Sequence, residues 1–302
     1  MMSGSLAALF SAFFYAVSMI CSRRGVLRIK DAALGGYISV FIAPPLFLLA
    51  AAVTGDLHSI TAFTWKGYFW LAIAGIVHFV LGRSSHYWTL RYLGANMASV
   101  FTSLQLVYIV FMGFFILGES VTANSLLGTA LIIVGPVLLL WPQRGAASQA
   151  DDGDSNKPRV TREGVIAGLL TGMFFGTSPL FIKWGLQQGG SALAGTFISY
   201  SSATLLFGAT MLRRVRREAI VNMERRAMLW FAWSGIFVGM ATLFRYIAFK
   251  YGSISISGPL VATSPVVLLF LSFILNRKLE SFRPNVILGT VLVVLGAIML
   301  YR

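Results

Sequence analysis

The chain has 302 residues, of which 57% are hydrophobic and 11% are charged, and its mean hydropathy is +0.79. So little polar surface excludes a water-soluble globule, and we expect an integral membrane protein. The net charge of +14 does not indicate a nucleic-acid partner, because the basic residues stand in loops beside apolar segments.

Apolar segments long enough to cross a bilayer follow one another along almost the whole chain. A helix needs about 17 to 25 residues to cross a hydrocarbon core of roughly 30 Å. We therefore predict an all-α integral membrane protein with ten transmembrane helices. The expected spans are residues 4–22, 32–54, 66–90, 95–117, 122–141, 163–186, 191–212, 228–250, 255–276 and 284–301.

The distribution of positive charge predicts the orientation. The loops after the first, third, fifth, seventh and ninth spans contain 18 of the 24 Lys and Arg residues. Cytoplasmic loops are enriched in these residues, so we expect both termini outside the cell. The expected location of the protein is a bacterial inner (plasma) membrane. Positive charge follows the first span and does not precede it, which argues against a cleavable signal peptide. Cys21 is the only cysteine, so no intrachain disulfide can form.

The second half of the sequence repeats the first. "ESVTANSLLGTALIIVG" at 119–135 returns as "ESFRPNVILGTVLVVLG" at 280–296, and "YWTLRY" at 87–92 returns as "YIAFKY" at 246–251. Because each copy has an odd number of spans, the second copy enters the membrane inverted, as is typical of secondary transporters. We expect a first five-helix repeat over residues 1–141, a cytoplasmic linker over 142–162 and a second repeat over 163–302.

Two halves that each end in a Glu followed by a glycine-rich helix resemble the EamA repeat of the drug/metabolite transporter superfamily. The resemblance implies a carrier whose central cavity is lined by the first four spans of each half, with the spans at 122–141 and 284–301 packed outside. It identifies a scaffold and not a substrate. Glu119 and Glu280 match the family's helix-entry Glu and are expected to cap helices, since a carboxylate at a helix N-terminus is favourable by about 0.3 to 1 kcal/mol.

Ionisable side chains inside the predicted spans indicate a functional site, because a charge at bilayer depth costs about 2.5 to 3.5 kcal/mol. His78, Arg83 and His86 share one broad face of the span 66–90, and Arg245 comes from the matching span 228–250. Two interpretations stay open for the arginines: contact with an anionic substrate, or snorkelling to the membrane interface. For His78, a satisfied buried histidine is an equal alternative to a cavity residue.

Further polar and aromatic side chains lie on faces expected to point towards the same axis. Hydroxyl groups in membrane helices often bond their own backbone, so each of these residues also has a structural interpretation. The predicted substrate-binding set is Tyr15, Ser18, His78, Arg83, His86, Tyr87, Gln105, Tyr108, Ser178, Thr242, Arg245 and Tyr246.

All ten Asp and Glu residues lie in loops or at helix ends, which disfavours proton-coupled export of cations through a membrane-embedded carboxylate. Any coupling to protons would fall on His78 or His86, because histidine titrates near neutral pH without perturbation. The sequence has no H-E-x-x-H, G-x-S-x-G or Walker motif and no cluster with metal-ligand spacing. We therefore expect neither an enzyme nor a metal or other cofactor.

These observations together predict a secondary transporter that functions as a monomer in the lipid bilayer and moves a small metabolite by alternating access. Arg83 and Arg245 favour a compound with a carboxylate, with an amino acid as the first candidate, because arginine binds a carboxylate through two parallel hydrogen bonds. The alternative is an exporter of neutral or cationic hydrophobic compounds held by aromatic side chains. A membrane-embedded enzyme is a distant third alternative.

Overall fold

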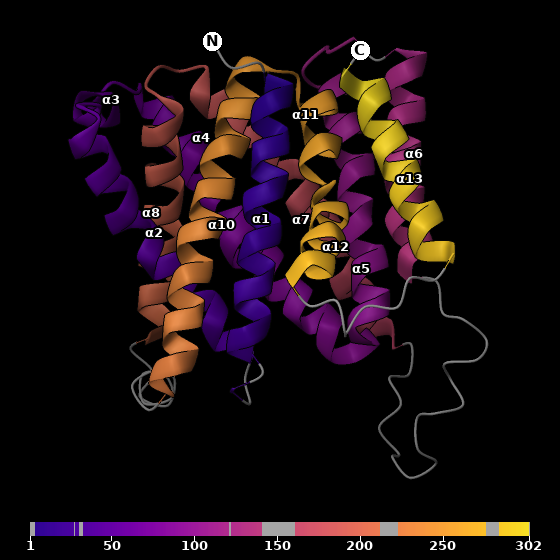
Figure 1. Ribbon diagram of the computed structural model, residues 1–302. Coiled ribbons are helices and arrows are strands. Elements are labelled where there is room, and N and C mark those ends of the chain that lie inside the picture. The colour runs from indigo at the N-terminus through magenta and orange to yellow at the C-terminus, as the bar shows by residue number, and fades with distance from the viewer. Residues whose placement is uncertain are drawn as a thin grey trace.

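The computed structural model describes residues 4–26, 28–29, 33–120, 122–140, 161–211, 223–275 and 284–301. Every regular element within these ranges is a helix, and the helices form one bundle (Figure 1). The predicted all-α class is therefore confirmed for the described residues. Residues 142–160 of the predicted linker, and Glu280, lie outside them.

The helices of each half follow the predicted spans in order. The first half contains α1 (Gly4–Val26), α2 (Ala33–Val53), α3 (Leu57–Thr61), α4 (Trp65–Gly75), the π-helix η1 (Ile76–Gly82), α5 (Arg83–Phe115) and α6 (Ala123–Leu140). The second half contains α7 (Arg162–Leu186), α8 (Ala192–Met211), α10 (Arg225–Tyr251), α11 (Ile254–Val261), α12 (Ser264–Leu275) and α13 (Pro284–Tyr301).

Several of these helices have the length and composition of membrane spans. Five qualify among the described residues: Gly4–Ser22, Trp65–Thr89, Arg162–Leu186, Ala192–Ala209 and Arg225–Tyr251. Shorter apolar helices add Val40–Val53, Leu104–Phe115, Ala123–Val134 and Ile254–Leu268. Large apolar side chains on the surface, such as Leu205 at 76% and Phe270 at 64% exposure, are the kind that contact lipid. The total of ten crossings stays a prediction.

The helix α5 contains a reversal of the chain. Two residues 16 positions apart in a straight helix are separated by about 24 Å along the axis. In α5, however, the Thr102 hydroxyl lies 3.2 Å from His86 Nδ1, and these residues are 16 positions apart. The chain therefore turns back between them. The predicted break between the spans 66–90 and 95–117 is not a helix boundary, because α5 continues through it, so their separation into two crossings stays a prediction.

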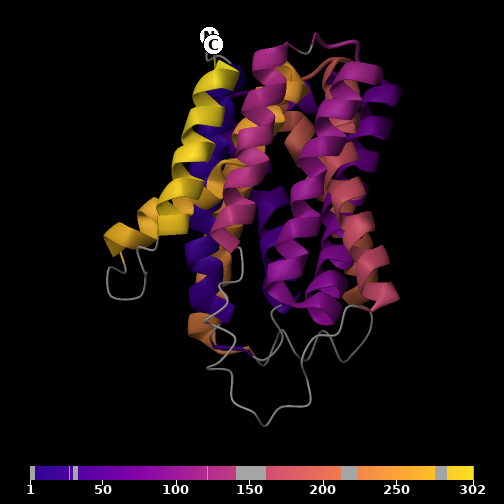
Figure 2. The same cartoon turned by 90° about the vertical axis from the view of Figure 1, so that its right-hand side faces the viewer.

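The main contacts between a helix of the first half and a helix of the second half have counterparts in which the corresponding helices have swapped halves. The first helix of each half packs on the third of the other: α1 contacts α10, and α7 contacts α4 and η1. Likewise α10 contacts α2, and α4 contacts α8. The final helices α6 and α13 pack against each other at one edge of the bundle (Figures 1 and 2). The sequence repeat is thus matched by a repeat in the packing.

Small residues bring the halves into close contact. A Cβ atom on Gly176 of α7 would lie 2.4 Å from the Tyr108 Cβ of α5, and one on Gly168 would lie 2.5 Å from the Phe101 ring. In α1 the matching positions Ala8, Ala12 and Ala16 are fully buried. Side chains this small let the helix backbones approach, which is how helices associate within a membrane.

The Glu119 carboxylate caps a helix, but not the one that it precedes in sequence. Its two oxygens accept hydrogen bonds from the backbone N–H groups of Ile254, at 2.8 Å, and Ser255, at 2.9 Å. The Ser255 hydroxyl also donates to it at 2.7 Å. The expectation of a cap is confirmed, whereas the implied partner helix at 122–141 is wrong. Glu119 from the first half satisfies the N-terminus of α11 in the second half, where a negative charge is favourable.

A hydroxyl seam joins α4 to α8 across the two halves. The Ser199 hydroxyl donates to Leu71 O at 2.7 Å, and the Ser202 hydroxyl donates to Ala72 O at 3.1 Å. Gly75 leaves space for this contact, because a Cβ there would lie 2.0 Å from the Ser199 carbonyl oxygen. The close approach of backbones at Gly75 therefore depends on the absence of a side chain.

Gly75→Ala is expected to lower the free energy of unfolding by about 1 to 3 kcal/mol, the usual cost of overpacking, because a methyl group there meets backbone atoms that cannot move independently. The matched control is Gly208→Ala in α8, where a Cβ would have no neighbour within 4 Å. Thermal unfolding in detergent compares the two variants. Equal melting temperatures would contradict the close α4–α8 contact.

Candidate functional site

A π-helix interrupts the apolar helix that carries the first candidate residues. The segment η1 covers Ile76–Gly82 and lies between α4 and α5. π-helical turns within α-helices are rare and often occur at functional sites, because the extra residue changes which side chains face inward. This one positions His78 and the buried ring of Phe79.

His78 and Arg245 meet between the two halves. The Nη1 atom of Arg245, on α10, lies 3.1 Å from the Nε2 atom of His78. Arginine has donors and no acceptor, so Nε2 of His78 must be the acceptor. The His78 ring is then neutral and carries its hydrogen on Nδ1. Arg245 contacts a group deep in the neighbouring helix, which favours the site interpretation over snorkelling for this residue.

Two further nitrogen atoms of this pair are buried and lack a hydrogen-bond partner within the described part of the chain. They are Nδ1 of His78 and Nε of Arg245. With the proton assignment above, both are N–H donors. A buried donor without an acceptor costs about 1 to 3 kcal/mol. The pair is therefore incomplete by itself and suits a group that brings acceptor atoms.

Aromatic rings surround the pair. The Phe175 ring of α7 lies 4.9 Å from the His78 ring and 6.2 Å from the His86 ring, measured between centroids. Gly82 permits this approach, because a Cβ there would lie 2.5 Å from the Phe175 ring. The Arg83 guanidinium carbon lies 5.4 Å from the centre of the Phe79 ring, within the range of a cation–π contact.

Tyr200 of α8 is a member of this group that sequence reasoning missed. Its ring is fully buried and stacks on Phe79 with 4.1 Å between centroids. Its hydroxyl group lies 3.0 Å from the hydroxyl oxygen of Thr242. Both Arg83 and Arg245 lie within electrostatic range of this tyrosine. The only signal in the sequence was an unusually polar stretch, "SYSS" at 199–202, within an apolar span.

No described carboxylate neutralises Arg245. The Asp56 carboxylate accepts from Ser59 and Ser191, Glu119 caps α11, and Glu224 pairs with Arg28 at 2.9 Å. Glu163 is exposed in the first turn of α7. Within the described ranges, no group of three His, Cys, Asp or Glu residues could hold a metal ion. The site thus has positive charge and hydrogen-bond donors without a resident counter-ion among these residues.

The structure brings one subset of the predicted site residues together. His78, Arg83, His86, Thr242 and Arg245 come from η1, α5 and α10. Arg83, His78 and Arg245 interact electrostatically with one another, and Arg83 also interacts with His86. Tyr15 of α1 lies within electrostatic range of Arg245 as well.

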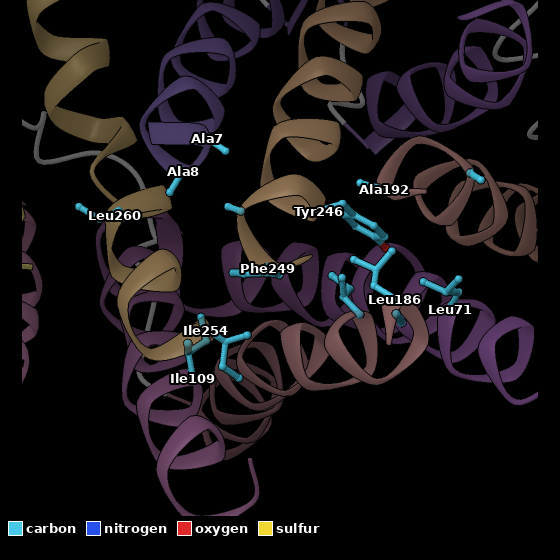
Figure 3. Packing of buried hydrophobic residues seen from close by; sticks show 14 of the residues in the cluster. Ala7, Ala8, Leu71, Ile109, Leu186, Ala192, Tyr246, Phe249, Ile254 and Leu260 are labelled. Atoms are coloured by element: carbon cyan, nitrogen blue, oxygen red, sulfur yellow. The ribbon is translucent and has the colours of Figure 1, made fainter. Parts of the chain in front are cut away.

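Other predicted residues have structural contacts. The Ser18 hydroxyl donates to Tyr15 O at 2.7 Å, and Ser18 O accepts from Ser234 at 3.1 Å. The Tyr246 ring is buried in the hydrophobic cluster with Leu186 and Ala192 (Figure 3).

The remaining predicted residues lie on α5 and α7. Gln105 and Tyr108 pack through their backbone and Cβ atoms against Gly176. Tyr87 is half-buried, with its ring 6.4 Å from that of His86. Ser178 is fully buried, and its hydroxyl has no hydrogen-bond partner among the described residues. Their role in binding stays a prediction.

Comparison with known proteins places the chain among membrane transporters. The sequence model of the EamA-like transporter family matches residues 2–141 and 162–302. Protein LicB of Haemophilus influenzae is 32% identical over 140 residues, which are 46% of this chain and 47% of LicB. The match thus spans about half the length of this relative. A solved structure described only as a crystal structure of a protein superposes with a TM-score of 0.74 over 98% of this chain and 95% of that chain, at 15% identity, which shows the fold alone.

The Tyr200–Thr242 contact is testable by a double-mutant cycle on the free energy of unfolding. Tyr200→Phe and Thr242→Val should each destabilise the protein by about 1 kcal/mol, because each removes one partner of a buried hydrogen bond. The double variant should lose about 0.5 to 1.5 kcal/mol less than the sum of the two. Tyr251→Phe, at a tyrosine 55% exposed, is the control and should show no coupling to Thr242→Val. Strict additivity at Tyr200 would rule out the contact.

Proposed function

Because the chain belongs to the EamA-like transporter family, we propose that it is a secondary transporter for a small metabolite with a carboxylate group, most simply an amino acid. One observation carries the proposal. The buried pair of His78 and Arg245 presents two N–H donors that have no acceptor among the described residues.

A carboxylate can accept hydrogen bonds from both unpaired N–H groups of this pair. It has two oxygen atoms that accept hydrogen bonds and a negative charge that offsets the arginines. Hydrogen bonds to charged groups contribute about 1.5 to 3 kcal/mol, roughly twice a neutral bond. Arg83 and Arg245 both lie close enough to attract the same anion. A substrate of this class would therefore satisfy atoms that are costly to bury alone.

The aromatic rings support a second candidate. Phe79, Phe175 and Tyr200 line the pair, and rings of this kind hold hydrophobic or cationic compounds by stacking and cation–π contact. A cation, however, would be repelled by Arg83 and Arg245. An exporter of neutral or cationic hydrophobic compounds is thus the alternative function. The family assignment makes catalysis the least favoured one.

The exchange symmetry of the packing supports transport by alternating access. In an inverted repeat the two halves swap conformations, so that a central site opens to one side and then to the other. Contacts between the halves at the end where α1 begins involve Glu119 with α11, Asp56 with Ser191, and Thr64 with Gln188. We place this end outside the cell, with both termini, and expect these contacts to separate when the site opens outwards.

A liposome counterflow screen tests the substrate class. We expect exchange of amino acids or other small carboxylates, compared with sugars, nucleosides and quaternary amines. Arg245→Gln should weaken the apparent affinity at least about tenfold, the equivalent of 1.5 to 3 kcal/mol for a charge-assisted bond. Arg226→Gln, at an exposed arginine in the first turn of α10, is the matched control.

Two results would contradict this proposal. Exchange confined to quaternary amines would establish the alternative substrate class. Unchanged affinity in Arg245→Gln, with only a lower folded yield, would assign Arg245 a structural role. Folded yield is measured by size-exclusion chromatography for each variant, so that loss of protein is not counted as loss of affinity.

The orientation is tested by cysteine labelling in a Cys21→Ala background. Lys66→Cys, at an exposed position in the first turn of α4, should react with a membrane-impermeant maleimide added to intact cells. Ser155→Cys, in the predicted cytoplasmic linker, should react only after the membrane is permeabilised. The opposite pattern would reverse the proposed orientation.

A further inference from the structure

We propose that His78 is a proton-binding site and that the transporter takes up one proton together with its anionic substrate. The inference rests on the proposed carboxylate substrate. The observation behind it is the bond between Arg245 Nη1 and His78 Nε2, at 3.1 Å.

Without substrate, Arg245 holds His78 in its neutral form. The guanidinium donates to Nε2, so that lone pair is occupied and cannot accept a proton. Protonating Nε2 would break the bond and place two positive groups 3.1 Å apart. In this state the pair therefore excludes a proton.

With substrate, the same geometry favours the proton. When a substrate carboxylate accepts hydrogen bonds from the Arg245 guanidinium, the N–H groups of Arg245 turn towards the carboxylate. Nε2 of His78 then no longer accepts from Arg245. The bound negative charge then stabilises an imidazolium, which donates from both ring nitrogens. One N–H bond forms on Nε2 with a proton from water on the open side, and the proton leaves with the substrate on the other side. Proton and anion thus bind cooperatively, which is the thermodynamic basis of cotransport.

The groups around His78 are compatible with this assignment. The charged groups that act on His78 directly are Arg245 of α10 and Arg83 of α5. Tyr246 of α10, Tyr200 of α8 and Tyr15 of α1 act on Arg245. His86 of α5 interacts with Arg83. On α7, which packs against η1, the contact to His78 comes from the apolar Phe175 ring. None of these described groups is a carboxylate, so the substrate supplies the negative charge that the imidazolium requires.

His86 is a weaker choice for the proton site. Its Nδ1 atom lies 3.2 Å from the Thr102 hydroxyl, which can donate or accept. A protonated His86 would keep this bond with the roles reversed, so its charge state is not tied to Arg245. His58 lies in the short helix α3, exposed and away from the pair. The obligatory donor opposite Nε2 distinguishes His78 from both.

Proteoliposomes loaded with a pH-sensitive dye test the inference. The probes are an equimolar mixture of the proteinogenic amino acids and, separately, a mixture of monocarboxylates, each added outside. For the wild type we expect acidification of the lumen on addition of the exchanging class. We also expect the apparent affinity to tighten as the pH falls, by up to about tenfold per pH unit, because proton and substrate bind cooperatively.

His78→Gln separates the proton from the substrate, because its amide oxygen can still accept from Arg245 but cannot titrate. This variant should show no acidification, and the counterflow that remains should not depend on pH. His58→Gln is the control and should behave as wild type. Acidification by His78→Gln equal to wild type, or counterflow by the wild type with no lumenal pH change, would overturn the inference. The wild-type measurement keeps the test valid even if the variant does not fold. Absence of carboxylate counterflow in the wild type would instead overturn the proposed function.

Discussion

Arg245 requires hydrogen-bond acceptors in a region where the protein offers few of them. Its guanidinium has five donors and no acceptor, and leaving such donors unpaired in an apolar interior is costly. Histidine is the acceptor that the neighbouring half supplies, through Nε2 of His78. This contact pairs only one nitrogen atom of each side chain. The other buried nitrogens, Nδ1 of His78 and Nε of Arg245, are N–H donors that have no acceptor among the described residues. A ligand with acceptor oxygens completes the set.

The surrounding fold holds this pair in position. The π-helix η1 directs His78 towards α10, and Gly82 lets the Phe175 ring close over it. At the end of α4, Gly75 allows the backbone to approach α8. Tyr200 of α8 in turn contacts Thr242, which lies one helical turn before Arg245 on α10. The contacts made by His78, Gly82 and Gly75 join one half of the chain to the other, whereas Tyr200 and Thr242 both belong to the second half. A movement of the halves relative to each other would therefore change the pair directly, as alternating access requires.

Much of the fold could be predicted from sequence because it depends on composition and repetition. Apolar segments, the repeat and the helix-entry Glu are local patterns, and helices follow them. Arg245 and His78 could be assigned to one site because each stands out as an ionisable residue within an apolar span. The π-helix could not be predicted, since it depends on packing against other helices and has no sequence period of its own. Tyr200 and the true partner of Glu119 were missed for a related reason: helical periodicity describes faces of one helix, not which helix of the other half each face meets.

The proton assignment of His78 is the most direct test of this account. Nitrogen NMR of ¹⁵N-histidine-labelled protein, with His58→Gln and His86→Gln used to assign the signals, distinguishes a protonated Nδ1 from a protonated Nε2. Without substrate, the account predicts a neutral His78 ring with hydrogen on Nδ1 and a bare Nε2 that accepts from Arg245. A hydrogen on Nε2, or a doubly protonated ring in the substrate-free protein, would contradict it.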